Sequence, residues 1–279
     1  MLQKHERHTA MEGFTLIELS IVLIIIGLLV GGILVGRDLI EAATIKAQIS
    51  QFQKYNSAVN TFRTKYNALP GDIIPIQAAA YGFVARAGTA GQGDGNGLIE
   101  GGATGSSVVA GEGATFWNDL STANLIDATL IGYDCTANTG TCLATSAAVP
   151  VTSIVPTCKL FPGCEMIVYA SGGLNYFSPL YLFRATGVDS NGFIHGNSTA
   201  GTPMEAYTID IKIDDGYPLT GVVTMVAPDV WPLPPPLATP AAPAPGVCVS
   251  NATVPPSYNI NGSANADTQT NCAIQVRIN

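Results

Sequence analysis

One uninterrupted apolar segment near the start of the chain restricts the available folds more than any other feature. Between Leu19 and Gly36 the sequence contains no charged residue. Together with the residues just before it, this segment approaches the ~20 apolar residues with which a helix spans a bilayer core. It follows a polar stretch, residues 1–13, in which Lys4 and Arg7 favour a cytoplasmic position. The sequence therefore predicts a membrane-inserted helix.

The order of small and apolar residues differs from that of a secretory signal peptide. A signal peptide carries its small-residue cleavage site after the apolar stretch, whereas Gly13 stands before it here. Cleavage after Gly13 would leave the apolar segment on the mature chain, with Phe14 as the new N-terminus. Glu18 would then place a carboxylate near the start of a membrane helix, where acids usually have a partner. Either the terminal amine of a neighbouring chain pairs with Glu18, or Glu18 reaches the headgroups.

The residues around this junction resemble a known processing signal. The sequence GFTLIEL at residues 13–19, between a polar leader and an apolar run, is similar to that of type IV prepilins and pseudopilins. The resemblance implies that prepilin peptidase, a membrane aspartyl protease, cuts between Gly13 and Phe14 and methylates Phe14. It also implies that Glu18 pairs with a neighbour's N-terminus while an inner-membrane platform assembles a homo-oligomeric helical filament.

The helix is expected to continue beyond the apolar segment. No proline occurs before Pro70, and no glycine lies between Gly36 and Gly71. Apolar residues recur there at spacings of three and four, as on one face of an amphipathic helix: Ile45, Ile49, Phe52, Tyr55, Val59, Phe62 and Tyr66. Residues 67–71 supply a stop. The expected organisation is a cleaved leader (1–13), a transmembrane or filament-core half-helix (14–36), an amphipathic half-helix (37–67) and a head (68–279).

The head is predicted to be rich in strands and loops, since the chain contains 30 glycines and 18 prolines. Residues 207–213 alternate between apolar and polar side chains, which predicts a half-buried strand. The other predicted elements are a helix at 114–124 and strands at 165–170, 180–184, 221–226 and 272–278. The proline-rich stretch 228–256 is expected to be an extended surface loop rather than core. The predicted fold class is α+β and type IV pilin-like, with the long helix packed against an antiparallel sheet.

All six cysteines follow residue 134. None forms a CxxC motif or lies near a histidine in the sequence, so a zinc site is not favoured. An even number of cysteines without such motifs is typical of disulfides in an exported protein. Six cysteines allow 15 pairings, among which the sequence alone does not decide. Because short loops close easily, sequential pairing is our working hypothesis: Cys135–Cys142, Cys158–Cys164 and Cys248–Cys272.

The charge of the chain argues against binding to nucleic acid. Its net charge is −8, and from Gly71 onward it carries five basic and fifteen acidic side chains. Nucleic-acid affinity depends largely on Lys and Arg that neutralise phosphates. The acidic body therefore excludes this class of partner.

Asp94, Asn96 and Glu100 have the spacing of oxygen ligands in a calcium loop. Leu98 stands where that pattern has a third oxygen side chain, and the neighbouring glycines also form a turn that needs no ion. We favour the turn and keep Ca²⁺ as an alternative. The acids at 210–215 likewise favour an Asp-Asp-Gly turn over a cation site.

No catalytic motif accompanies these features. After removal of the leader, His195 is the only histidine, and a lone loop histidine is more often an ordinary polar residue, so we expect no enzyme. The expected function is a structural subunit of a type IV pilus, located in the inner membrane as a precursor and then on the cell surface. The alternatives are a periplasmic pseudopilin of a type II secretion system and a membrane-anchored binding protein or enzyme.

Overall fold

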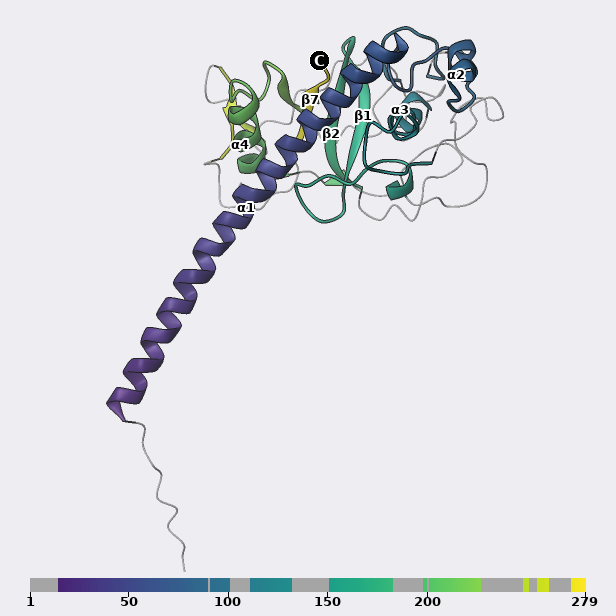
Figure 1. Ribbon diagram of the computed structural model, residues 1–279. Coiled ribbons are helices and arrows are strands. Elements are labelled where there is room, and N and C mark those ends of the chain that lie inside the picture. Colours follow the sequence, from purple (N-terminus) through teal and green to yellow (C-terminus); the bar gives the residue numbers. More distant parts are fainter. Residues whose placement is uncertain are drawn as a thin grey trace, which may run out of the picture. The chain divides into compact units, whose positions relative to one another are not determined.

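The computed structural model divides the chain into two compact units. The described residues are 15–89, 91–100, 111–131, 151–182, 198–199, 201–226, 248–250, 255–260 and 272–279. One unit is Met1–Ala43 and the other is Thr44–Asn279. Helix α1 (Leu16–Tyr66) contributes to both units (Figure 1). The expected leader, with Gly13, and Phe14 lie outside the described residues.

In the first unit, the side chains of α1 are exposed almost throughout. Leu16, Ile24 and Leu28 are 88%, 70% and 77% exposed. The helix is long and apolar enough to cross a membrane, which confirms the apolar helix expected from the sequence. A helix with this length and composition close to the N-terminus indicates a membrane anchor or a signal sequence.

In the second unit, α1 is amphipathic and buries one face. Its buried side chains recur at helical spacing: Ile45, Gln48, Phe52, Tyr55, Ala58, Val59, Phe62 and Tyr66. Of the apolar face expected from the sequence, Ile49 alone is only partly buried. The helix ends at Asn67, which has a left-handed φ of 51° and donates its N–H to the Arg63 carbonyl at 2.8 Å. This is a common way to end a helix, and it confirms the stop predicted for residues 67–71.

An antiparallel sheet forms the centre of the second unit. Its main strands, in spatial order, are β1 (Cys164–Ser171), β2 (Leu174–Leu182), β7 (Ala273–Arg277) and β4 (Val223–Val226). The short strand β3 (Ser198–Thr199) pairs with the end of β2, and a separate small sheet pairs β5 (Val249–Ser250) with β6 (Ser257–Tyr258). The described part of the chain thus combines a long helix with an antiparallel sheet, as the α+β prediction requires.

The turn between β1 and β2 sets the register of the central hairpin. Gly172 and Gly173 have φ of 58° and 78°, the positive values that a two-residue type I′ turn requires at both positions. Ser171 consequently lies opposite Leu174. The strand predicted at 180–184 matches only the far end of β2.

The described residues also form three further helices and one 3₁₀ turn: α2 (Pro75–Tyr81), α3 (Gly111–Thr122), α4 (Pro203–Ile213) and η1 (Val151–Ser153). In Figure 1, α1 passes across the strands and α3 lies beside β1. The rings of Tyr55 and Trp117 lie 4.8 Å apart edge to face, and Phe177 lies 6.0 Å from Tyr55. These aromatic contacts join α1, α3 and β2 in one core.

Residues 207–213 form a helix, so the strand predicted there is wrong. Helix α4 begins with a capping box, in which Thr202 accepts from the Glu205 N–H while the Glu205 side chain accepts from the Thr202 N–H. Pro203 occupies the first turn, where the missing proline N–H has no effect on the helix. The cap and the burial of Ala206 and Ile209, three residues apart as on one helix face, outweigh the apolar–polar alternation that favours a strand.

The remaining predicted elements agree with the structure except at their ends, and α2, β3, β5 and β6 are not predicted. The predicted strands at 165–170, 221–226 and 272–278 correspond to β1, β4 and β7, and the predicted helix at 114–124 corresponds to α3. In the proline-rich stretch, residues 227–247 and 251–254 lie outside the described residues. Cys248 and Val249 are each only 1% exposed, so this part of the stretch is core, contrary to the expectation of a surface loop.

Candidate functional site

Glu18 lies at the start of α1, three residues after Thr15. The Thr15 backbone N–H and hydroxyl donate to Glu18 Oε2 at 2.8 and 2.7 Å, and the Glu18 N–H donates to Thr15 Oγ1 at 3.3 Å. This reciprocal arrangement is a capping box, which satisfies N–H groups that have no partner within the helix. In the single chain, Glu18 therefore stabilises its own helix. The T-x-x-E spacing is the signal that could have revealed this role.

The surface of α1 beyond Glu18 is apolar on every side. Seventeen large apolar side chains between Leu16 and Ile40 are at least 50% exposed. A helix that is apolar all round is normally buried in a membrane or in the core of an assembly, and burial gains about 25 cal/mol per Å² of apolar surface. This surface can therefore bind lipid or other apolar helices.

Residues 91–100 form a glycine-rich loop around the carboxylate of Asp72, a residue that precedes the loop in the sequence. Asp72 Oδ1 accepts from the Gly95 N–H at 2.6 Å, and Asp72 Oδ2 accepts from the Gly97 N–H at 2.7 Å. These glycines have φ of 79° and 85°, a left-handed conformation that glycine adopts without strain. The glycines thus direct two N–H groups at one buried carboxylate.

A second buried carboxylate, Glu112 at the start of α3, lies against the same loop. It accepts from the Gly93 N–H at 2.7 Å and from the Glu100 N–H at 2.9 Å. A Cβ added to Gly93 would come within 2.4 Å of a backbone oxygen, so the loop requires glycine there. Oxygen atoms of Asp72, Asp94 and Glu112 all lie within 4.8 Å of one another. Of the three residues inferred from spacing, this acidic group contains Asp94 alone.

The residues considered as calcium ligands, Asp94, Asn96 and Glu100, share Asp94 with this group but are arranged as a turn. The Asn96 side-chain amide donates to Asp94 Oδ2 at 3.2 Å and to Glu100 Oε2 at 3.3 Å. Its oxygen accepts from the Leu98 N–H at 2.7 Å, whereas calcium would need that oxygen as a ligand. Calcium at these residues stays the alternative to the turn.

Burial raises the pKa values of both loop-bound carboxyls. Desolvation is the largest cause, and it raises the pKa of Glu112 to about 9 and that of Asp72 to about 6, against the opposing effect of the backbone N–H groups. Glu112 therefore holds its proton at neutral pH, which lets acids lie together without a counter-ion. A divalent cation held by Asp72, Asp94 and Glu112 would instead neutralise the negative charges of the three carboxylates.

The free energy of unfolding should fall as the pH rises from about 5 to about 9. The pKa of Glu112 is about 9 in the folded chain against 4.5 for an exposed glutamate, so the folded state binds the additional proton between these values. Loss of that proton favours unfolding, by up to about 1.4 kcal/mol per pH unit. Urea denaturation of the full chain in detergent, followed by tryptophan fluorescence at several pH values, measures this dependence.

Glu112→Gln tests whether this one carboxyl is responsible. The variant removes the titrating group, so its stability should vary less with pH than that of the wild type. Glu100→Gln removes a partly exposed carboxyl from the same loop and serves as the control that keeps the wild-type slope. An unchanged slope in Glu112→Gln would contradict the assignment.

A second acidic group, at the end of α4, consists of Asp210, Asp214 and Asp215. Asp210 accepts from the Tyr258 hydroxyl at 2.7 Å and from the Gly216 N–H at 3.2 Å. Burial is the main cause that raises the pKa of Asp210 to about 6. The contacts of this group stabilise the Asp-Asp-Gly turn that the sequence favours.

A buried ion pair between Arg86 and Asp119 is not predicted from the sequence. Arg86 donates to Asp119 Oδ1 at 2.8 Å and to Oδ2 at 3.1 Å, and the two side chains are 1% and 0% exposed. Gly71 donates its N–H to Asp119 at 2.7 Å, and its carbonyl accepts from Arg86 at 3.1 Å. The pair therefore holds the loop after α1 against α3, next to Asp72.

Two disulfides close loops in the described part of the head. They are Cys158–Cys164 and Cys248–Cys272, two of the three sequential pairs expected. Cys135 and Cys142 lie outside the described residues. The longer loop, which spans 24 positions in the sequence, attaches the end of the proline-rich stretch to the residue before β7.

Removal of the longer disulfide should destabilise the head more than removal of the shorter one. The loop-closure model gives about 3.5 kcal/mol for a 24-position separation and about 2.4 kcal/mol for a 6-position separation. Each pair is replaced by two serines so that no free thiol remains, and urea midpoints are compared. The reverse order of stabilities would contradict this account.

His195 is the one histidine that the sequence offers for acid–base or nucleophilic catalysis in the mature chain. His195 lies outside the described residues. The expectation that the chain is not an enzyme stays a prediction.

Comparison of the chain with protein-family models, with curated proteins and with solved structures finds no match. The assignment of a function therefore rests on the residues themselves. Those that distinguish the chain most are the apolar helix and the carboxylate of Glu18 at its start.

Proposed function

We propose that the chain is a structural subunit of a type IV pilus or a related filament, made as a membrane-inserted precursor. Prepilin peptidase cuts between Gly13 and Phe14 and methylates Phe14. The mature chains then leave the membrane and polymerise through α1, on an inner-membrane assembly platform. The apolar half of α1 forms the core of the filament.

The observation that carries this proposal is the apolar surface of α1, which the described chain leaves exposed. Lipid covers such a surface in the precursor, and α1 helices of neighbouring chains cover it in a filament. Because both environments bury it, transfer between them loses little apolar stabilisation. Glu18 is the one charged residue of this apolar half, and a carboxylate is costly in lipid. Its charge therefore favours the filament, where the terminal amine of a neighbouring chain would pair with it.

A pseudopilin of a type II secretion system has the same requirements for α1 and is the nearest alternative. Its filament stays in the periplasm, whereas a pilus reaches the cell surface. The large head, with its six cysteines and proline-rich stretch, favours the surface filament. A membrane-anchored binding protein or enzyme is the third candidate, and its activity would not depend on Glu18.

Intact mass and N-terminal peptide mapping test the proposal. We expect material sheared from the cell surface to begin at methylated Phe14. A cut chain found only in the cell envelope would favour the pseudopilin. A mature envelope protein that still begins at Met1 would overturn the filament proposal. Gly13→Ala serves as the processing control, because it should accumulate as the uncut precursor.

A further inference from the structure

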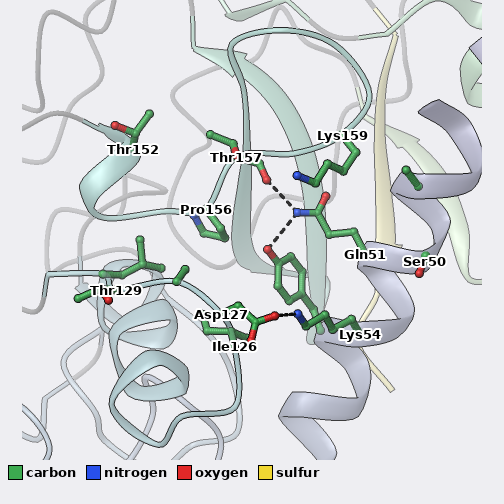
Figure 2. A pocket seen from close by; sticks show the side chains of 14 residues that line it. Ser50, Gln51, Lys54, Ile126, Asp127, Thr129, Thr152, Pro156, Thr157 and Lys159 are labelled. Carbon is green, nitrogen blue, oxygen red and sulfur yellow. Dashed lines mark hydrogen bonds and ion pairs between the residues drawn. The ribbon is translucent and has the colours of Figure 1, made fainter. Parts of the chain in front are cut away.

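A polar cleft lies beside α1 in the second unit, apart from the groups described above. It has a volume of about 490 Å³, within the usual range of small-molecule sites. Its walls come from residues 47–55 of α1, residues 126–130 after α3, and residues 152–159 before β1. Figure 2 shows Gln51 and Lys54 on the α1 side and Pro156 on the other. We call it the α1 cleft.

The charge of the α1 cleft is opposite to that of the whole chain. Its charged lining residues are Lys54, Lys159 and Asp127, which sum to +1, whereas the chain carries −8. Lys54 forms an ion pair with Asp127, and their side chains are 51% and 89% exposed, so water screens the pair. No described residue pairs with the exposed Lys159 ammonium. An incoming anion can therefore bind the Lys159 ammonium and share the Lys54 ammonium with Asp127.

The uncharged lining can form hydrogen bonds with hydroxyl groups. The Gln51 side-chain amide donates to the Thr157 carbonyl at 2.8 Å and to the Tyr55 hydroxyl at 3.0 Å. Because a carbonyl only accepts, these contacts fix the orientation of the Gln51 side chain. Its oxygen accepts no hydrogen bond within the described chain. The hydroxyls of Thr129 and Thr152 also line the cleft and can both donate and accept.

Apolar side chains complete the lining. Ile126 and Leu130 are each 7% exposed, and the buried Pro156 lies between the polar groups in Figure 2. Such a mixture of apolar surface with a few polar groups matches the two kinds of surface on a sugar ring, its C–H groups and its hydroxyls.

We infer that the α1 cleft binds an acidic saccharide of one to three residues, with a carboxylate at Lys159 and Lys54. A neutral sugar would gain no attraction from the two ammonium groups, and a free inorganic anion would leave most of the volume and the hydroxyls unused. The inference does not depend on filament assembly, because all the lining residues belong to one chain.

Titration of the full chain in detergent tests the site, with trigalacturonate as the acidic probe and maltotriose as the neutral one. Saturation-transfer NMR and calorimetry should detect trigalacturonate at least about tenfold more tightly than maltotriose, since a hydrogen bond to a charged group contributes about that much. Binding should weaken as salt is added. Equal affinities, or no binding of trigalacturonate, would overturn the inference.

Lys159→Ala should weaken trigalacturonate binding about tenfold. Lys212→Ala, which removes an exposed lysine of α4 outside the cleft, should bind as the wild type does. Because Lys159 is exposed, its replacement should leave the melting temperature unchanged. An unchanged melting temperature shows that the variant is folded and that the weaker binding comes from the lost ammonium group. Wild-type affinity in Lys159→Ala would refute the site. Binding of a hexa-aspartate peptide without binding of trigalacturonate would instead assign the cleft to an acidic polypeptide.

Discussion

Glu18→Ala is expected to abolish or strongly reduce filament assembly while cleavage of the precursor continues. In a filament, the Glu18 carboxylate would pair with the terminal amine of a neighbouring chain, and alanine cannot replace that charge. Electron microscopy of the sheared fraction measures assembly, and peptide mapping of the envelope measures cleavage. We expect filaments to fall at least about tenfold, since removal of one partner of a poorly solvated ion pair costs more than about 1.4 kcal/mol.

The capping box complicates this result, because alanine also removes the hydrogen bonds to Thr15. Glu18→Gln separates the two roles. Glutamine can take the same position in a capping box, so the helix start is kept while the charge is lost. If pairing between chains matters, Glu18→Gln should assemble as poorly as Glu18→Ala. Normal filaments from Glu18→Gln would show that the cap, rather than the charge, is what assembly requires.

Helix α1 could be predicted from the sequence because its signals are long and agree with one another. The charge-free run, the absence of proline before Pro70 and the apolar repeat from Ile45 to Tyr66 all extend over many turns. Its stop at Asn67 is also local, since a left-handed residue after a helix is favoured by asparagine and glycine. Signals that repeat over fifty residues outweigh any single contact elsewhere in the chain.

Helix α4 shows where local pattern reading fails. Seven residues, 207–213, are too few to separate a period of two from a period of 3.6, because Ile209 and Ile213 fit both. The decisive signals stand just before them, in Thr202, Pro203 and Glu205. A cap before an ambiguous run should therefore be read together with the run.

The acidic loop and the buried ion pair depend on contacts between distant segments. Asp72 and Glu112 are separated by forty positions, and neither is part of the spaced motif at 94–100. Their approach follows from the packing of α3 against the loop after α1. Short-range spacing therefore identified the loop correctly as glycine-rich but did not identify the carboxylates that it surrounds.

Asp119→Asn should destabilise the head by about 3–5 kcal/mol, the usual cost of removing one partner of a buried ion pair. The substitution leaves the guanidinium of Arg86 buried, and the side chain that replaces the carboxylate is neutral. The Gly71 N–H also donates to Asp119 Oδ2, and asparagine keeps only one acceptor oxygen for Arg86 and Gly71 together. Urea denaturation of the full chain in detergent, followed by tryptophan fluorescence, measures the loss, because Trp117 lies in the same helix and is fully buried.

Asp127→Asn is the matched control, since it removes one carboxylate from the exposed ion pair that Asp127 forms with Lys54. Lys54 and Asp127 are both largely exposed, so water solvates the lysine that remains, and the loss should be within about 1 kcal/mol. The same chemical change thus gives a small effect where water reaches the partner and a large one where it does not. Equal losses in the two variants would mean that desolvation of Arg86 does not determine the stability of the loop after α1. A further variant that replaces both Arg86 and Asp119 by apolar residues should recover part of the loss, because it leaves no buried charge.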